Sequence, residues 1–261
     1  MDRNPVHYTF NPAGGRSSPR LAYNSCKRRT GAARVRQVIG QAAPAREARF
    51  GAVLTARDAT YRARDYRSFE YVSLEVAPGQ VHALLTVRGS DARDFLLAAA
   101  GSLRLSGGAV ERAGDARLGL VPGVNDVPAG VPAGRALALE LSLAGRASGL
   151  EDVLALAEQF RLATQVDVPA DALDAASRVR LGAALACAWD PALVAVDATF
   201  AAMPPHEGDR LLSALSSRAR AHGTAFLVAT ASPELAARAD AATPMDLDAR
   251  EAFARCEGGD R

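Results

Sequence analysis

Three short apolar runs most constrain how this chain can fold. They are 81-VHALL-85, 193-LVAVD-197 and 225-AFLVAT-230, and each has the length and apolar content typical of a strand buried on both faces. Helical periodicity separates the second run from the third, in 207-EGDRLLSALSSRARAH-222, which ends at Gly223. Strands that alternate with helices predict an α/β fold with a parallel sheet.

Two segments before the first apolar run have a different pattern. In 50-FGAVLTA-56 and 70-EYVSLEVAPGQ-80 apolar and polar residues alternate, and the second segment ends in a Pro-Gly turn. Alternation of this kind predicts two strands. A helix is expected next, over about 92–100, followed by a short strand in 118-LGLV-121.

Residues 123 to 188 are expected to be mostly helical. Asp174 is the expected N-cap of a helix in 175-AASRVRLGAALACAW-189, because its carboxylate can accept the first free backbone N–H groups. The segment 150-LEDVLALAEQFRLA-163 also has helical periodicity. Its expected apolar face consists of Leu150, Val153, Leu154, Ala157 and Phe160.

Composition narrows the class of protein. Hydrophobic residues make up 49% of the 261 residues and charged residues 23%, which is usual for a soluble globular protein. No apolar run approaches the roughly 20 uncharged residues that a membrane-spanning helix needs. Cys26, Cys187 and Cys256 have no paired spacing. We therefore expect neither a disulfide framework nor a zinc site, and a reducing cytoplasm as the location.

The first 49 residues differ from the rest and are expected to form a disordered basic extension. The first fifty contain ten Arg or Lys residues, including Lys27, the single lysine of the chain, against two acidic residues. An organellar presequence, a nucleic-acid-binding arm and a plain or misassigned tail all fit this composition. Tyr8 and Tyr23 are not interleaved with a basic stripe, so there is no strong nucleic-acid signal.

From residue 52 to 250 the chain resembles the ATP-binding subunit of an ABC transporter. The stretches that carry the likeness are 54-LTARDAT-60, 72-VSLEVAPGQVHALL-85, 96-LLAAAGSLRLSGGAVERAG-114, 191-PALVAVDATFAAM-203 and 223-GTAFLVATASPE-234. The resemblance implies a P-loop NTPase-like ABC ATPase fold, with a mostly parallel central sheet, an antiparallel β edge and a helical subdomain.

The same resemblance implies how the chain is divided. The ABC ATPase-like domain is expected over 50–250 and is followed by a C-terminal tail at 251–261. Within the domain, a RecA-like core is expected at about 50–122 and 181–250, and the helical subdomain at about 123–180.

The family's phosphate loop, Gly-x-x-x-x-Gly-Lys followed by Ser or Thr, falls here on residues 86–93. Such a loop works because glycines let backbone N–H groups surround the phosphates, a lysine reaches the β and γ phosphates, and a hydroxyl coordinates Mg²⁺. In this register Asp91 replaces the second glycine, Ala92 the lysine and Arg93 the hydroxyl residue. The degenerate nucleotide-binding register consists of Arg88, Gly89, Ser90, Asp91, Ala92 and Arg93.

Acidic residues begin the helix that follows this loop. Ser90 or Asp91 is the expected N-cap, and the carboxylates of Asp91 and Asp94 are expected to occupy the positive helix end that would otherwise attract phosphate.

The other motif positions have also lost the residues that the resemblance requires. Asp197 stands at the Walker B aspartate, but the adjacent glutamate that would act as general base is Ala198. The signature sequence Leu-Ser-Gly-Gly-Gln falls on Leu173, Asp174, Ala175, Ala176 and Ser177. Gly123 stands at the position of the glutamine that senses the γ phosphate and faces the membrane subunit. Ala231 stands at the position of the switch histidine. Ala63 stands at the position of the aromatic residue that stacks on adenine, and Tyr61 is close to it.

These losses predict a non-catalytic pseudo-ATPase with no cofactor and no metal, in the cytoplasm or peripheral to the inner face of the cell membrane. The resemblance implies an ABC permease subunit, a second ABC ATPase subunit or a second copy of the chain as partner.

Three other interpretations stay open. A divergent ATPase would use Arg88 or Arg93 for phosphate charge and Asp197 for Mg²⁺. A binding module unrelated to transport would dock its basic tail on nucleic acid or anionic lipid. A gene drifting under little selection would also lose its motifs, although the apolar faces and helix stops remain intact.

Overall fold

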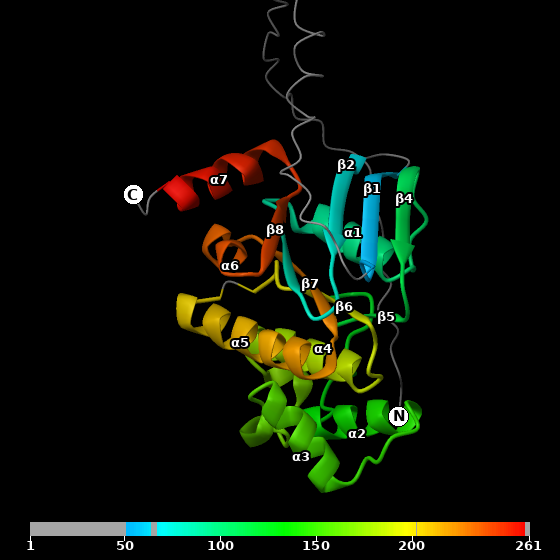
Figure 1. The fold of residues 1–261 in the computed structure, drawn as a ribbon. Helices are drawn as coiled ribbons and strands as arrows, with labels where there is room; N and C mark the ends of the chain where they lie inside the picture. The colour runs from blue at the N-terminus through cyan, green and yellow to red at the C-terminus, as the bar shows by residue number, and fades with distance from the viewer. Residues whose placement is uncertain (1–50, 64–66, 202, 259–261) are drawn as a thin grey trace, which may run out of the picture. The chain divides into compact units, whose positions relative to one another are not determined.

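The structure, a computed structural model, describes residues 51–63, 67–201 and 203–258. The basic extension expected at 1–49 lies outside the described residues. The described part comprises an antiparallel sheet, a parallel sheet and the helices that cover them (Figure 1).

The antiparallel sheet has three strands in the order β2-β1-β4. They are β1 (Leu54–Arg62), β2 (Arg67–Val76) and β4 (Gly107–Arg112). The alternating segments predicted β1 and β2, although β1 begins four residues later than expected. Sequence reasoning missed β4, because its polar and glycine-rich content gives no strand periodicity.

The parallel sheet has five strands in the order β5-β6-β7-β3-β8. Its three central strands, β3 (Val81–Leu85), β6 (Leu193–Asp197) and β7 (Ala225–Thr230), are buried at every residue, and they confirm the three apolar runs. The edge strands are β5 (Ala116–Leu118) and β8 (Ala241–Pro244), of which β8 was not predicted.

The strand expected at 118–121 was placed too late, because the chain leaves the sheet after Leu118. Only the Gly119 N–H continues the ladder, donating to the Ala195 carbonyl at 2.8 Å. The Asn125 side chain then accepts from the Val121 N–H at 2.8 Å and donates to the Gly119 carbonyl at 2.9 Å. These bonds hold residues 119–125 as a turn.

The positions of the helices agree in part with those predicted from the helical periodicity of the sequence. They are α1 (Gly89–Ala99), α2 (Ala133–Leu143), α3 (Leu150–Gln159), α4 (Ala175–Cys187), α5 (Pro205–His222), α6 (Pro233–Ala237) and α7 (Leu247–Gly258). Leu150, at one end of the expected apolar face of α3, does not reach the core. Its side chain is 71% exposed, because it stands at the first position of α3, ahead of the turn that packs on the core through Val153.

Three helix boundaries bear on the predictions. Asp174 is the N-cap of α4, as expected, and Gly223 ends α5 in the left-handed conformation with φ of 72°. Helix α7 runs through residue 250, where the domain was expected to give way to a tail.

Helix α1 lies between the two sheets and joins them into one core (Figure 1). Its Phe95 is fully buried and meets Phe69 of β2 edge-on, with ring centroids 5.2 Å apart. The opposite face of the parallel sheet is covered by α4 and α5, and α2 and α3 pack in turn on that layer. The loops at the carboxyl ends of β3, β6 and β7 therefore meet next to the start of α1.

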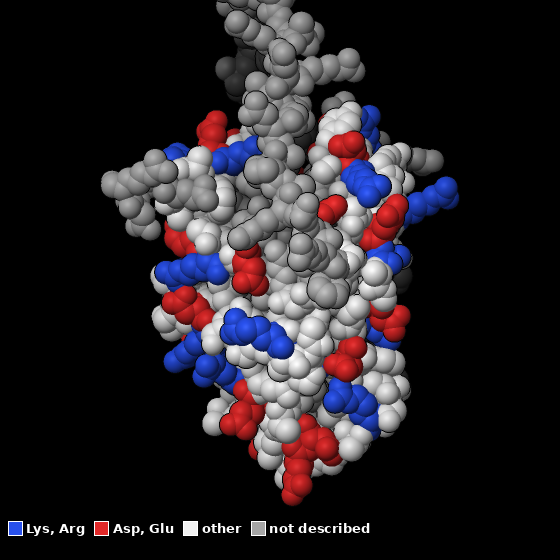
Figure 2. Space-filling view, viewed as in Figure 1, with Lys and Arg blue, Asp and Glu red and all other residues white. Residues whose placement is uncertain are grey.

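The surface has no single dominant charge on the face that Figure 2 shows, where basic and acidic side chains are interspersed. Within the described ranges, no helix is both long and apolar enough to cross a membrane.

Candidate functional site

The predicted phosphate turn is the connection between β3 and α1. Only residues 86–88 separate the last residue of the strand from the first residue of the helix. The Thr86 N–H donates to the Thr230 carbonyl at 3.0 Å, and the Arg88 N–H donates to the Thr86 hydroxyl at 3.0 Å. These two backbone donors are therefore bonded within the protein.

The start of α1 differs from the prediction. The N-cap is Arg88 rather than Ser90 or Asp91, and its carbonyl accepts the N–H groups of Asp91 and Ala92 at 3.1 and 3.5 Å. Ser90 and Asp91 therefore lie inside the first turn, and no side chain caps the helix.

Asp91 lies in the first turn of α1, as expected. Its carboxylate accepts from the Ser90 hydroxyl at 3.0 Å and not from the helix N–H groups. The side chain is buried, and burial raises the pKa of Asp91 from its usual value. Asp94 lies half-buried on the next turn.

Ala92 and Arg93 occupy the positions of the lysine and the metal-binding hydroxyl. Ala92 has no solvent exposure and packs with Phe95 and Leu96 in the core between the two sheets. Arg93 is half-buried, and its Nε is buried with no hydrogen-bond partner among the described residues. Neither position holds a group that could grip phosphate or Mg²⁺ as the family's residues do.

Asp197 ends β6 and lies close to this turn. Its Oδ1 accepts from the Thr199 N–H and hydroxyl at 2.9 and 2.7 Å, while its Oδ2 is buried and unpartnered within the described ranges. Thr199 in turn approaches Gly89, where an added Cβ would stand only 2.9 Å from the Thr199 hydroxyl. The end of β6 and the turn thus contact each other.

The residues present do not fit ATP and Mg²⁺. The register lacks the lysine and the hydroxyl residue that follows it, several of its backbone donors are bonded internally, and buried Ala198 cannot activate water. In the part of the chain that the structure describes, no three His, Cys, Asp or Glu residues are grouped as a metal site requires.

The signature register forms the start of α4, and hydrogen bonds join two of its own residues. Asp174 accepts from the Ser177 N–H and hydroxyl, each at 2.8 Å. The hydrogen bond from the Ser177 N–H lowers the pKa of Asp174, which keeps its carboxylate ionised. Leu173, Ala176 and Ser177 are buried, and Asp174 and Ala175 are exposed. An exposed anion therefore stands where the family presents a serine to the partner's nucleotide.

We expect Asp174→Ala to lower the free energy of unfolding by about 1 kcal/mol at neutral pH, because α4 loses its N-cap. Since the folded pKa of Asp174 is lowered, this contribution is complete above the unfolded pKa of about 3.9 and disappears as the pH falls through the folded value. Urea unfolding at several pH values measures both effects. Asp174→Asn is the control, since the amide oxygen of asparagine still accepts the Ser177 N–H but does not titrate. If Asp174→Ala lowered the free energy of unfolding equally at every pH, the role of the ionised Asp174 carboxylate as N-cap would be contradicted.

The remaining motif positions lie in separate places. Gly123 is in the exposed turn after β5, with φ of 77°, and Ala231 follows β7 and lines a second pocket, of about 670 Å³. Tyr61 packs against Phe69, with ring centroids 6.3 Å apart, and belongs to the core between the sheets. Tyr61 is therefore committed to packing, and Ala63 follows β1.

His82, His206 and His222, the histidines among the described residues, share no site. His82 is buried in β3, its Nε2 lies 2.9 Å from the Thr243 hydroxyl, and burial lowers its pKa to about 4. His206 and His222 lie at opposite ends of α5.

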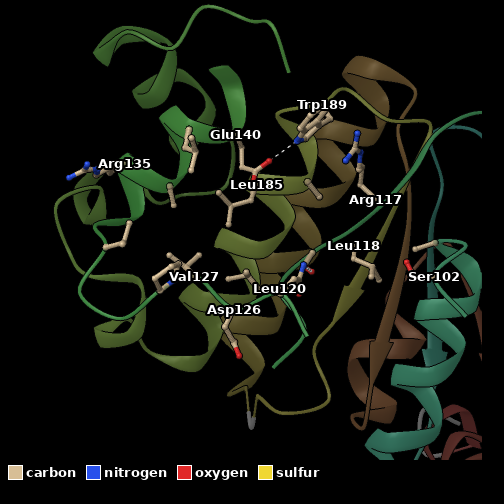
Figure 3. A pocket seen from close by; sticks show the side chains of 18 of the residues that line it. Ser102, Arg117, Leu118, Leu120, Asp126, Val127, Arg135, Glu140, Leu185 and Trp189 are labelled. Atoms are coloured by element: carbon tan, nitrogen blue, oxygen red, sulfur yellow. Dashed lines mark hydrogen bonds between the residues drawn. The ribbon is translucent and has the colours of Figure 1, made fainter. Parts of the chain in front are cut away.

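A groove that sequence reasoning missed lies between β5, the turn after it, α2 and the end of α4. We call it the subdomain groove, and it encloses about 800 Å³. Trp189, Glu140, Arg117, Arg135, Leu139 and Leu185 line it (Figure 3). Trp189 is the single tryptophan of the chain, and its position after α4 is the one signal that could have drawn attention to this surface.

Comparison with known proteins shows the fold. No protein-family model matches the sequence, and no curated protein matches it. Among solved structures, CbiO1 of Clostridium perfringens, part of the ABC transporter complex CbiONQ, is similar with a TM-score of 0.63 and 14% identity, over 80% of this chain and 93% of that chain. An ATP-binding cassette of an ABC transporter is similar with a TM-score of 0.60 and 14% identity, over 76% of this chain and 88% of that one.

These likenesses confirm the predicted fold class. The chain has the α/β P-loop NTPase-like fold of the ATP-binding components of ABC transporters.

Proposed function

We propose that this protein is a non-catalytic ABC ATPase-like subunit, which keeps the fold of the family but neither binds nor hydrolyses ATP. The observation that carries the proposal is the closed phosphate turn. Helix α1 starts at Gly89, and the N–H groups of Thr86, Arg88, Asp91 and Ala92 are all bonded within the protein.

Two further observations support the loss of nucleotide chemistry. At the Walker B end, Ala198 replaces the general base, and one carboxylate oxygen of Asp197 is bonded to Thr199. At the signature, the ionised carboxylate of Asp174 would repel the phosphates of a nucleotide bound to a partner subunit. A head-to-tail dimer would therefore lack a good composite site on either side.

With its catalytic parts lost, the protein acts by binding another protein at the inner face of the cell membrane. An ABC permease subunit or a catalytic ABC ATPase is the proposed partner, and a second copy of the chain is the other possibility. CbiO1, which is similar in fold, is part of a transporter complex. A pull-down from solubilised membranes tests this partnership by recovering a permease or a second ATPase.

We expect millimolar Mg-ATP to leave the melting temperature of the protein unchanged. A ligand at 100 times its Kd adds about 2.7 kcal/mol to the free energy of unfolding, which would raise the melting temperature by several degrees in a chain of this size. Differential scanning fluorimetry measures the shift, with an ABC ATPase that has an intact phosphate loop as control. A saturable rise with Mg-ATP would refute the proposal.

One observation favours a divergent active ATPase instead. The buried Oδ2 of Asp197 has no hydrogen-bond partner among the described residues, so it could accept Mg²⁺. That function requires Mg²⁺-dependent ATP turnover that disappears in both Asp197→Ala and Asp197→Asn. We expect no turnover in the unmodified protein.

A further inference from the structure

The second pocket, which encloses about 670 Å³, lies at the carboxyl ends of β6 and β7, between the start of α5 and the neighbouring helix α6 (Figure 1). Its apolar walls come from the loop after β6 and from α6, and they consist of Phe200, Met203, Pro204, Pro205 and Leu235. A hollow of this size with apolar walls is typical of a site for a small molecule.

Packing between α5 and α6 closes the pocket on one side. Gly208 of α5 and Leu235 of α6 are both buried and line the hollow. They touch so closely that a Cβ added at Gly208 would stand 2.7 Å from Leu235 Cδ1. Phe200 and Met203, in contrast, are only half-buried. The pocket therefore has a firm floor and an aromatic ring and a thioether that remain accessible.

The two charged side chains of the lining differ in their ion pairs. Arg238 is paired with Asp209. Glu234 forms no ion pair within the described ranges and accepts from the Ser232 hydroxyl at 2.8 Å. Hydrogen bonds from its own backbone N–H and from Ser232 lower the pKa of Glu234, so its carboxylate is ionised at neutral pH. The rim of the pocket thus presents an anion that lacks a counter-ion.

A second carboxylate lies behind the wall that Thr199 forms. The hydroxyl of Thr199, which lines the pocket, donates to Asp197 Oδ1 at 2.7 Å. Asp197 is 1% exposed, and its Oδ2 has no hydrogen-bond partner among the described residues. The first turn of α5, whose N–H groups would favour an anion, already holds the Glu207 carboxylate. The pocket therefore favours a cation over an anion.

We infer that the second pocket binds a small organic cation, in which an ammonium group is joined to an apolar body of about the size of an aromatic ring. The apolar body packs on Phe200 and Met203, and the ammonium group pairs with Glu234 at the rim. The face of the Phe200 ring adds a further favourable contact for a cation. This site goes beyond the proposed function, because it requires neither ATP nor a partner protein.

Three probes that share one apolar body test the charge preference. They are phenylbutylamine, phenylbutanol and phenylbutyrate, and isothermal titration calorimetry with the full-length chain at neutral pH measures the Kd of each. We expect the amine to bind about fivefold more tightly than the alcohol, since an exposed carboxylate forms a modest ion pair. The anionic phenylbutyrate should bind most weakly of the three, and added salt should reduce the preference for the amine.

Two pairs of variants locate the contact. Glu234→Gln should reduce the preference for the amine over the alcohol to less than about twofold, whereas Glu251→Gln, at an exposed position of α7, should leave it unchanged. Ala231→Leu adds bulk at an exposed position of the lining and should weaken the binding of all three probes. Ala237→Leu is its control, because Ala237 is exposed on α6 outside the lining.

Four results would overturn the inference. The first is no detectable binding of the amine at millimolar concentration, and the second is an alcohol that binds as tightly as the amine. The third is tightest binding by phenylbutyrate, which would make Arg238 the charge that selects the ligand. The fourth is an unchanged Kd of the amine for the Ala231→Leu variant, which would place its binding outside the second pocket.

Discussion

Replacing Ala92 by lysine, the residue that the family carries there, is expected to destabilise the protein by about 3 kcal/mol or more and not to restore ATP binding. Ala92 has no solvent exposure and lies against Phe95 and Leu96 in the core between the sheets. A lysine side chain would overpack this core, at a cost of about 1–3 kcal/mol. Its amine would also be buried without a carboxylate partner or forced to lose its proton. Urea unfolding measures the free-energy change, and scanning fluorimetry with Mg-ATP tests for binding.

The matched control for this substitution is Ala155→Lys. Ala155 also lies in a helix, α3, but is exposed to solvent, so the change should stay at about 0.5 kcal/mol. A stable Ala92→Lys variant that binds ATP would show that only the lysine is missing, and it would refute the argument from the closed turn.

The second large effect is expected at Glu207, which pairs with a buried arginine. Arg180 of α4 is 5% exposed, and its guanidinium donates to Glu207 Oε2 at 2.6 Å and to the Ser177 hydroxyl at 2.9 Å. Glu207→Ala would leave the Arg180 charge buried with no carboxylate partner, which costs about 3–5 kcal/mol. Urea unfolding measures the loss.

Arg210→Ala provides the matched control. Arg210 also donates to Glu207, at 2.7 Å, but its side chain is 58% exposed, so its removal should cost less than about 1 kcal/mol. Equal losses in the two variants would contradict a special role for the buried pair.

The Arg180 pair connects the signature register to the core. Asp174, Ser177, Arg180 and Glu207 form a continuous set of hydrogen bonds from the start of α4 to the start of α5. The signature residues thus stabilise the protein's own packing.

Much of the fold could be predicted because its strands and helices have strong local patterns. The three central strands are almost purely apolar, Asp174 caps α4 and Gly223 ends α5. The edge strands β4 and β8 escaped prediction, since edge positions demand little apolar content and leave a weak pattern.

The candidate site was predictable only as a set of missing residues. The register located Ala92, Ala198 and Asp174 in the chain, but it placed the N-cap of α1 at Ser90 or Asp91, whereas Arg88 holds it. The local sequence misled here because no side chain caps the start of the helix, so the capping residues Ser90 and Asp91 do not mark it.

The sequence by itself determined the α/β fold, since apolar runs of strand length alternating with helical periodicity can bury their surfaces in few other ways. It also located the motif registers in the chain. Only the tertiary structure decided that the Thr86 N–H is bonded to the Thr230 carbonyl, and that Arg117, Arg135 and Trp189 line one groove. Both features join residues far apart in the chain, and contacts of that kind leave no periodic trace in the sequence.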